Sequence, residues 1–314
     1  MGREEVPLLE VRLPTGGTGE EAWRTTRRRA ELRLPRLAIA ESPAAPQERF
    51  SIQIRRPEGR PISWEMVPDQ NAEAPFLGLL EALRDPPAPS PLAGLTPLPK
   101  VTLYAARWCS ASSGALALLC PLAAAEPSLA LRVVDGEDLA PEERPPALAS
   151  VPWVVLGEGE SRLFGTFSEG EFREALEAHL RGEGPLWTLR HLLSRKLAGE
   201  VRELLAAGVL RARDLGRLVV FPDLGTRLAA THFLSEEAGR GGLDLSEAGE
   251  ALVEALLLKD PRDRGDAAYA LGEMGDPRFL KALEALRADP DGEVREAAEE
   301  AAERIRMRGG PLTG

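Results

Sequence analysis

The hydrophobic pattern between residues 100 and 180 changes from strand-like to helix-like and back. Short apolar segments bounded by turn residues predict strands, and apolar residues that recur at three- and four-residue intervals predict helices. The predicted elements are a strand at 100–106, a helix at 110–119, strands at 129–134 and 150–156, a short strand ending at 165 and a helix at 168–180. This alternation predicts an α/β unit over residues 100–181.

The first 84 residues show the same kinds of pattern. The predicted elements are a strand at 8–13, a helix at 19–32, strands at 37–40, 50–55 and 61–66, and a helix at 74–83. Residues 85–99 follow and are rich in proline, which keeps such a segment out of helix and strand. We therefore expect a first α/β unit at 1–84 and a linker at 85–99.

The rest of the chain is predicted to be helical, with a connector at 182–223 and a weak repeat at 224–308. In the repeat, Asp260-Pro261 and Asp289-Pro290 each begin a copy, about thirty residues apart, and proline suits the first turn of a helix. A more degenerate copy is expected at 225–257. Stacked helix pairs present a surface to partners, whereas a small helical bundle is the simpler alternative.

Three features of residues 100–181 carry a resemblance to a known family. Trp108-Cys109 follows the first strand, Val151-Pro152 begins the third and Gly165 follows the fourth. In this order the segment resembles the thioredoxin/glutaredoxin fold. The family's proline is cis and lies beside the active-site sulfur, so the resemblance implies a cis Pro152 next to Cys109.

The organisation of the whole chain also resembles known families. A cysteine-free unit followed by a cysteine-bearing one is similar to the two-fold protein disulfide oxidoreductases of thermophiles and to the amino-terminal part of alkyl hydroperoxide reductase flavoproteins. The likeness is best over 50–180, and residues 1–49 match poorly. The C-terminal repeats resemble the short HEAT repeats of the phycobilisome-lyase type. The expected fold class is therefore α/β plus all-α, with tandem thioredoxin-like folds (the first degenerate) followed by a helical HEAT-like repeat domain.

Cys109 is the residue best placed for chemistry. It stands where a strand meets a helix, and the partial positive charge of the helix N-terminus favours a thiolate. The motif reads Cys109-Ser110-Ala111-Ser112, so a serine occupies the position of the resolving thiol of a Cys-x-x-Cys enzyme. Cys120 is about 16 Å further along the helix, whereas a disulfide needs Cα atoms within about 7 Å. We therefore expect Cys120 to be a buried structural thiol.

Three roles are open for Cys109. It can exchange disulfides as a monothiol (CxxS) protein, with Ser112 donating a hydrogen bond to the thiolate and a small cellular thiol releasing the mixed disulfide. Trp108, Val151 and Pro152 would then contact the substrate. It can instead be one ligand of a shared iron–sulfur cluster, as in monothiol glutaredoxins, although their Cys-Gly-Phe-Ser motif does not match. It can also be a relic in a fold that now serves as a binding platform.

These roles lead to two hypotheses for the whole chain. The first is a glutaredoxin-like exchange protein whose HEAT-like tail docks a protein partner. The second is a catalytically degenerate adaptor that acts only in protein–protein interaction. Both stay open at this point, because nothing in the motif itself decides whether the thiol is used.

Composition narrows the functional classes. The net charge of −11 argues against a general nucleic-acid binder, because phosphate contacts need a basic surface. Two cysteines do not form a disulfide scaffold. No signal peptide is recognisable and the longest apolar run, 115–131, is interrupted by prolines and a glutamate, so we expect no membrane span and a cytoplasmic location. The scattered His179, His191 and His232 predict no metal site, and no cofactor is expected.

Overall fold

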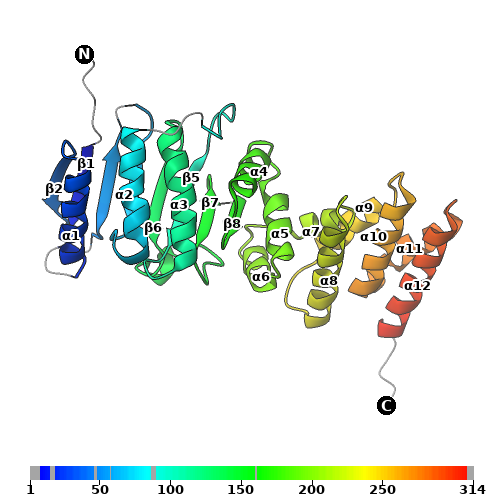
Figure 1. Cartoon of the computed structure of the whole chain (residues 1–314). Helices are drawn as coiled ribbons and strands as arrows, with labels where there is room; N and C mark the ends of the chain where they lie inside the picture. Colours follow the sequence, from blue (N-terminus) through cyan, green and yellow to red (C-terminus); the bar gives the residue numbers. More distant parts are fainter. Residues whose placement is uncertain are drawn as a thin grey trace. The chain divides into compact units, whose positions relative to one another are not determined.

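The computed structural model describes residues 8–14, 18–45, 48–56, 58–85, 90–159 and 161–309. The chain divides into two compact units, Met1–Gly184 and Pro185–Gly314. The first unit is mixed α/β and the second is helical (Figure 1). The predicted fold class is therefore confirmed.

The amino-terminal unit is built on one mixed sheet. Within the described residues, eight strands lie in the order β2-β1-β3-β4-β6-β5-β7-β8. The elements of the first half are β1 (Leu8–Leu13), α1 (Thr18–Arg33), β2 (Ala38–Pro43), β3 (Ser51–Arg55), β4 (Ile62–Glu65) and α2 (Gln70–Arg84). Those of the second half are β5 (Lys100–Ala105), α3 (Ser110–Ala125), β6 (Ala130–Asp135), the 3-10 turn η1 (Pro141–Glu143), β7 (Trp153–Leu156), β8 (Ser161–Phe164) and α4 (Glu169–Leu180).

The two halves share one topology. In each half a helix joins two parallel strands, β1 to β2 through α1 and β5 to β6 through α3. The third strand pairs antiparallel with the first, the fourth pairs antiparallel with the third, and a helix follows. This is the thioredoxin topology. The segment 1–49, which matches poorly in sequence, supplies β1, α1 and β2 and so completes the first fold.

A parallel pairing of β4 with β6 joins the two halves into a single sheet. The pairing places Trp64 of the first half beside Val133 of the second. The proline-rich segment 85–99 therefore connects two folds that share a sheet.

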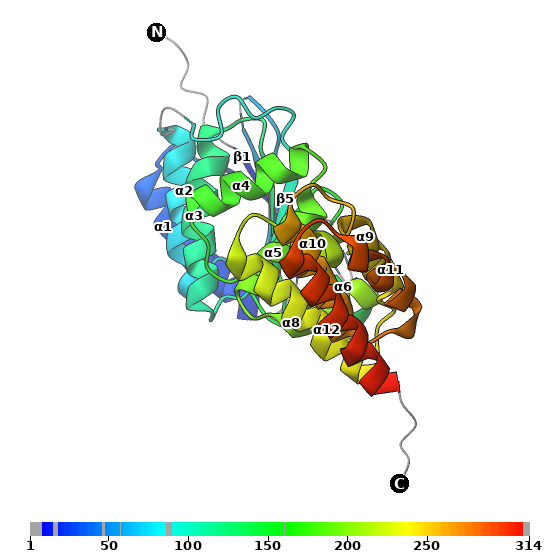
Figure 2. The ribbon, with the colours of Figure 1, turned by 90° about the vertical axis from the view of Figure 1, so that its right-hand side faces the viewer.

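Alternation along the strands decides which face of the sheet the helices cover. Ile52, Ile54 and Trp64 are fully buried on the covered face. The helices supply aromatic neighbours to this face. The ring of Phe76 in α2 packs edge-on against Trp64, with 5.0 Å between ring centroids, and against Trp23 of α1, with 6.3 Å. Figure 1 and Figure 2 both show α1, α2 and α3 side by side along this face. The hydrophobic core of the first half thus lies between the sheet and these helices.

The opposite face of the first half carries polar side chains at the intervening positions. Gln53 Nε2 donates to Ser63 Oγ at 2.8 Å, and Ser63 Oγ donates to Glu65 at 2.9 Å. Glu65 also accepts two hydrogen bonds from Arg132 of β6, at 2.7 and 2.6 Å. Burial alone would raise the pKa of Glu65, but these bonds to Arg132 overcome that effect and lower it. The polar row therefore crosses the boundary between the two halves.

Arg56 lies at the same boundary. Its guanidinium donates to main-chain carbonyls at and beyond the end of α3, including those of Ala123 at 2.6 Å and Leu129 at 2.8 Å. Burial lowers the pKa of Arg56. Gly59, in the neighbouring turn, has a φ of +94°, and a Cβ there would lie 2.3 Å from the carbonyl oxygen of Pro127. The turn between β3 and β4 is thus held against the segment between α3 and β6.

The carboxy-terminal unit is a stack of helices. α10 packs between α8 and α12, and α9 packs against α7 and α10. None of the helices that the structure describes combines the length and apolarity needed to cross a membrane. The elements are α5 (Gly184–Ser194), α6 (Ala198–Ala206), α7 (Ala212–Val219), α8 (Leu224–Arg240), α9 (Ser246–Ala255), α10 (Pro261–Met274), η2 (Pro277–Phe279), α11 (Leu280–Ala285), η3 (Leu286–Ala288) and α12 (Gly292–Gly309).

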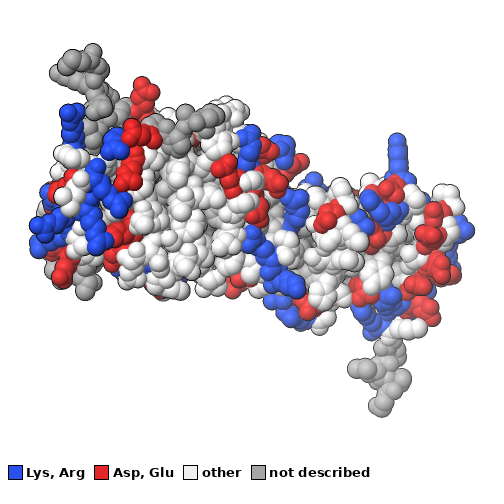
Figure 3. All heavy atoms as spheres, viewed as in Figure 1, with Lys and Arg blue, Asp and Glu red and all other residues white. Residues whose placement is uncertain are grey.

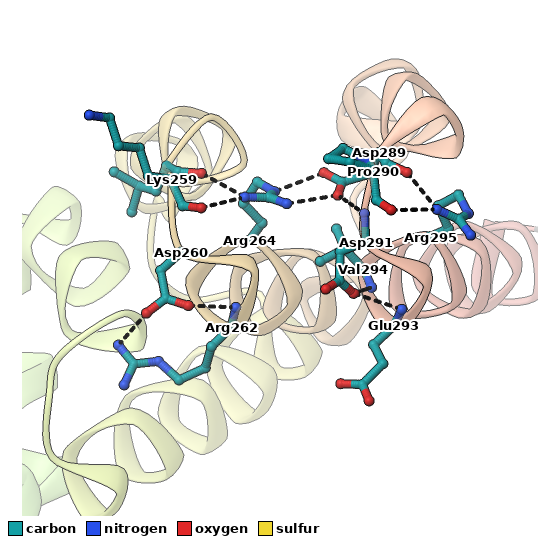
Figure 4. A network of polar contacts seen from close by, with 11 residues as sticks. Lys259, Asp260, Arg262, Arg264, Asp289, Pro290, Asp291, Glu293, Val294 and Arg295 are labelled. Carbon is teal, nitrogen blue, oxygen red and sulfur yellow. Dashed lines mark hydrogen bonds and ion pairs between the residues drawn. The ribbon is translucent and has the colours of Figure 1, made fainter.

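Three of these helices, α8, α10 and α12, begin with the same local motif. An aspartate accepts hydrogen bonds from the first-turn amides, and an arginine four residues later donates to the two carbonyls that precede the aspartate. The pairs are Asp223 with Arg227, Asp260 with Arg264, and Asp291 with Arg295. Figure 4 shows the second and third of them. Arg264 also binds Asp289 of the next repeat through two hydrogen bonds, at 2.8 and 2.7 Å, so the motif links successive repeats.

Candidate functional site

Cys109 lies at the N-terminus of α3, directly after β5. It is the N-cap residue of the helix, with φ −85° and ψ 116°, and its side chain is half-buried. Its Sγ lies 3.6 Å from the carbonyl oxygen of Val151. The peptide bond from Val151 to Pro152 is cis, as expected. The structure therefore brings together Cys109 and the Val151-Pro152 pair, which are forty-two positions apart in the sequence.

Trp108 and Ser112 flank the thiol differently. Trp108 is 60% exposed, which is unusual for a large aromatic side chain, and Ser112 is fully buried. Ser112 Oγ accepts a hydrogen bond from the amide of Ala106 at 3.2 Å, and the amide of Cys109 donates to the carbonyl of Ala106 at 3.1 Å. Ser112 thus helps to hold the turn before the helix. Its predicted role as a donor to the thiolate stays a prediction.

The surface around α3 carries little charge. No residue between Ser110 and Ala125 is charged, and Figure 3 shows mostly uncharged atoms over α3 on the face displayed. An exposed tryptophan beside an uncharged helix suits contact with an apolar or neutral surface.

Both halves of the unit contribute further polar side chains to this region. Asn71 Nδ2, from the first half, donates to the carbonyl of Trp108 at 2.9 Å. The guanidinium of Arg107 lies 3.3 Å from carboxylate oxygens of both Asp69 and Asp135. Asp135 is 2% exposed, and this burial raises its pKa although Arg107 acts in the opposite direction. Sequence reasoning missed Asp69 and Asn71, because only the shared sheet places them beside the cysteine loop.

Cys120 is a structural thiol, as predicted. It is 1% exposed, and burial raises the pKa of its thiol to about 12. A thiol in this state forms almost no thiolate near neutral pH, which makes it a poor nucleophile.

The three histidines have separate surroundings. His179 Nδ1 lies 2.7 Å from Ser161 Oγ, the ring of His191 stacks on Trp187 at 4.8 Å, and His232 is 3.9 Å from Glu236. Within the described part of the chain, no group of three or more His, Cys, Asp or Glu residues could hold a metal ion.

A groove in the carboxy-terminal unit is a second candidate site. It has a volume of about 750 Å³ and lies between one face of α8 and the turn from α5 to α6. Of the residues that line it, Leu193 and Phe233 are buried, whereas Leu228 is 61% exposed. The lining also includes Lys196 from the turn and Glu236 from α8. Apolar grooves rimmed by polar residues are a feature of surfaces that bind other proteins, so this groove is a candidate docking site.

Comparison with known proteins identifies the repeats. Residues 226–303 match the family described as HEAT repeats. The range runs from the first turn of α8 into α12 and includes most of the segment predicted to be HEAT-like. No curated protein matches the chain.

The chain also shows partial similarity to solved structures of a reductase and of a repeat protein. The alkylhydroperoxide reductase AhpF of Enterococcus faecalis is 16% identical, with a TM-score of 0.44 over 55% of this chain and 90% of that one. The Sso1120 protein of Sulfolobus solfataricus is 14% identical, with a TM-score of 0.36 over 48% and 86%. A designed armadillo repeat protein is 19% identical, with a TM-score of 0.27 over 39% and 56%. By its own strand order and its family match, this chain is a tandem thioredoxin-like fold followed by HEAT repeats.

Proposed function

We propose that the chain is a monothiol thiol–disulfide exchange protein whose HEAT repeats dock a protein partner. One observation carries the redox part: the half-buried Sγ of Cys109 lies at the N-terminus of α3, beside the cis peptide bond between Val151 and Pro152. A helix N-terminus stabilises a thiolate. The main chain at Val151 and the cis Pro152 that follows offer a bound peptide or thiol a surface to lie against. Trp108, which is exposed beside the sulfur, adds an apolar contact.

The chemistry needs one protein thiol and one small thiol. The Cys109 thiolate attacks a disulfide, forms a new S–S bond with one sulfur and expels the other as a thiolate. A low-molecular-weight thiolate then attacks the mixed disulfide at the sulfur that is not Cys109. This step joins the small thiol to that sulfur in a new disulfide and returns Cys109 as the thiolate. Where that sulfur belongs to a small thiol, the product is a small-molecule disulfide; where it belongs to a client protein, a second small thiolate attacks the new disulfide at the small-thiol sulfur and frees the client thiolate. The small thiols end as a disulfide and supply the electrons that reduce the substrate, so no second cysteine is required.

A rival function is an adaptor that no longer uses the thiol. The contact between Sγ and the Val151 carbonyl favours it, because a thiol can donate to that oxygen and a thiolate cannot. The adaptor would bind through the uncharged surface near α3 and through the HEAT repeats. A cytoplasmic location is proposed for either function, because both cysteines are free and thiols stay reduced there.

Mixed-disulfide formation separates the two functions. The folded protein is incubated with glutathione disulfide and its mass is followed. Exchange predicts one adduct per chain, absent in Cys109→Ser and unchanged in Cys120→Ser, and its removal by added glutathione. A Cys109 that reacts no faster than free cysteine at the same pH contradicts the exchange function and favours the adaptor.

Partner capture tests the docking role. Proteins that are released from the wild type by reductant and absent with Cys109→Ala are disulfide-linked clients. Proteins that remain bound in both cases are docked. For these, Leu228→Glu and Leu257→Glu form a matched pair, because both leucines are exposed (61% and 85%) and only Leu228 borders the α8 groove. Docked proteins that bind both variants as well as the wild type would contradict a role for either surface.

A further inference from the structure

We propose that the cysteine-free first half of the amino-terminal unit positions the Cys109 loop, through Asp69 and Asn71 at the start of α2. This inference rests on the proposed exchange function of Cys109. It assigns a role to a thioredoxin-like fold that has no thiol of its own. Three unusual features of residues 69–71, at the start of α2, support this inference.

The first feature is at Asp69, the N-cap residue of α2. An aspartate at this position normally accepts a hydrogen bond from an amide of the first turn. The side chain of Asp69 makes no such bond. Its carboxylate lies 3.3 Å from Nη1 of Arg107 instead. The residue therefore leaves its own helix uncapped while it binds the loop that leads to Cys109.

The second feature is at Gln70, which has a φ of +49°. Residues other than glycine seldom adopt this left-handed conformation, and they keep it only where the surrounding structure requires it. Here it precedes the amide of Asn71, which donates to the carbonyl of Arg107 at 3.1 Å. A first-turn amide of α2 thus finds its partner in the other thioredoxin-like fold.

The third feature is the side chain of Asn71, whose Nδ2 donates to the carbonyl of Trp108 at 2.9 Å. One residue therefore holds the carbonyls of both positions that precede Cys109. Asn71 is also the only asparagine among the 314 residues. The single asparagine of the chain thus stands at the position from which a short side-chain amide can donate to the cysteine loop.

The consequence concerns the peptide bond between Trp108 and Cys109. While the carbonyl of Trp108 accepts the hydrogen bond from Asn71, the lone pairs of its oxygen point to the first fold. Without this hydrogen bond the peptide can rotate and bring the oxygen toward Sγ of Cys109. The partial negative charge of the oxygen would then disfavour a thiolate there. The direction from which the sulfur attacks would change as well, and exchange is sensitive to this geometry. Asp69 and Asn71 are thus positioning residues, since they act through the main chain of the loop and the side chain of Arg107.

The test measures the rate constant of Cys109 with glutathione disulfide in the full-length protein, together with the thermal midpoint. Asn71→Ala removes the donor without weakening α2, because alanine has the higher helix propensity. We expect the rate to fall about tenfold and Asn71→Gln, which keeps an amide donor, to recover part of it. Ser168→Ala is the matched control, because it removes the side-chain cap of α4 in the same unit. It should lower the thermal midpoint and leave the rate unchanged.

Each result decides something. A rate for Asn71→Ala within twofold of the wild type overturns the positioning role and leaves the exchange function standing. An equal fall in the rate for Ser168→Ala also overturns it, because the effect would then follow stability. A wild-type protein that forms no mixed disulfide at Cys109 overturns the exchange function and the positioning role together.

Discussion

Replacing Arg56 with alanine tests whether one guanidinium holds the two thioredoxin-like halves together. Arg56 follows β3 in the first half, and its side chain reaches the end of α3 in the second. It donates to the carbonyls of Ala123 at 2.6 Å, Glu126 at 3.2 Å and Leu129 at 2.8 Å. The last carbonyls of a helix lack hydrogen-bond partners within the helix and carry partial negative charge. A cation there is stabilised both by hydrogen bonds to these carbonyls and by the helix dipole.

The structure sets the size of the expected loss. A hydrogen bond from a charged donor contributes about 1.5–3 kcal/mol, but these bonds share one side chain and are not additive. Arg56 is only partly buried, so water can replace some of its hydrogen bonds and reduce the loss. The variant also no longer bears the free-energy cost of burying a cation, which reduces the loss further. We therefore expect Arg56→Ala to lower the free energy of unfolding by about 3 kcal/mol. For a unit of this size that corresponds to a fall of about 9 °C in the thermal midpoint.

Arg55→Ala is the matched control for this experiment. Arg55 is the preceding residue, is exposed, and pairs with Glu10 at 2.8 Å on the surface. Loss of such a pair costs about 0.5 kcal/mol. Urea unfolding followed by tryptophan fluorescence reports on this unit, because Trp23, Trp64 and Trp153 are fully buried in it. Arg56→Lys should recover only part of the loss, since an ammonium lacks the planar fork of donors. Equal, small effects of Arg56→Ala and Arg55→Ala would refute the reasoning.

Three further predictions follow from other contacts. The pKa of Glu65 is lowered in the folded protein. Its contribution to stability is therefore present above the unfolded pKa of about 4.3 and is lost as pH falls through the folded pKa. Glu65→Gln should reduce the difference in urea midpoint between pH 7 and pH 3, and an unchanged difference would contradict this. Gly272→Ala should destabilise the carboxy-terminal unit by about 1–3 kcal/mol, because a Cβ there lies 2.7 Å from the Cα of Ala301. Gly265→Ala in the same helix meets nothing within 4 Å and should stabilise by about 0.5–1 kcal/mol; calorimetry showing the two variants alike would contradict the packing argument. Arg264→Ala should lower the thermal midpoint more than Arg262→Ala, because Arg264 bridges two repeats through Asp289 whereas Arg262 pairs with Asp263 beside it; equal shifts would show that the bridge contributes little.

The repeat motif shows what sequence reasoning found and what it overlooked. The Asp-Pro pairs and the thirty-residue spacing were enough to predict HEAT-like repeats, and the family match confirms them. The pairing of an N-cap aspartate with an arginine four residues later was also readable, at Asp223, Asp260 and Asp291. The structural role of this pairing could not be predicted from the sequence. The arginine binds two carbonyls that precede the helix, and only the folded turn brings the guanidinium and these carbonyls together.

The candidate site divides in the same way. The position of Cys109 at the end of a strand and the start of a helix follows from local hydrophobic pattern, which neighbouring residues along the chain determine. The approach of Val151 to its sulfur was predicted from a family resemblance. The contacts from Asn71 and Asp69 were not predicted at all, since they depend on the pairing of β4 with β6.

By itself, the sequence determined the order of strands and helices, the two classes of fold and the absence of a second thiol near Cys109. These properties depend on residues close together in the chain, where periodicity, capping and proline act directly. Only the tertiary structure decided that the two thioredoxin-like halves share one sheet, that Arg56 binds the end of α3, and that a fold without cysteine holds the loop of the fold that has one. Such contacts join positions about forty to seventy residues apart, and they form because burying the apolar faces of both halves brings those positions together.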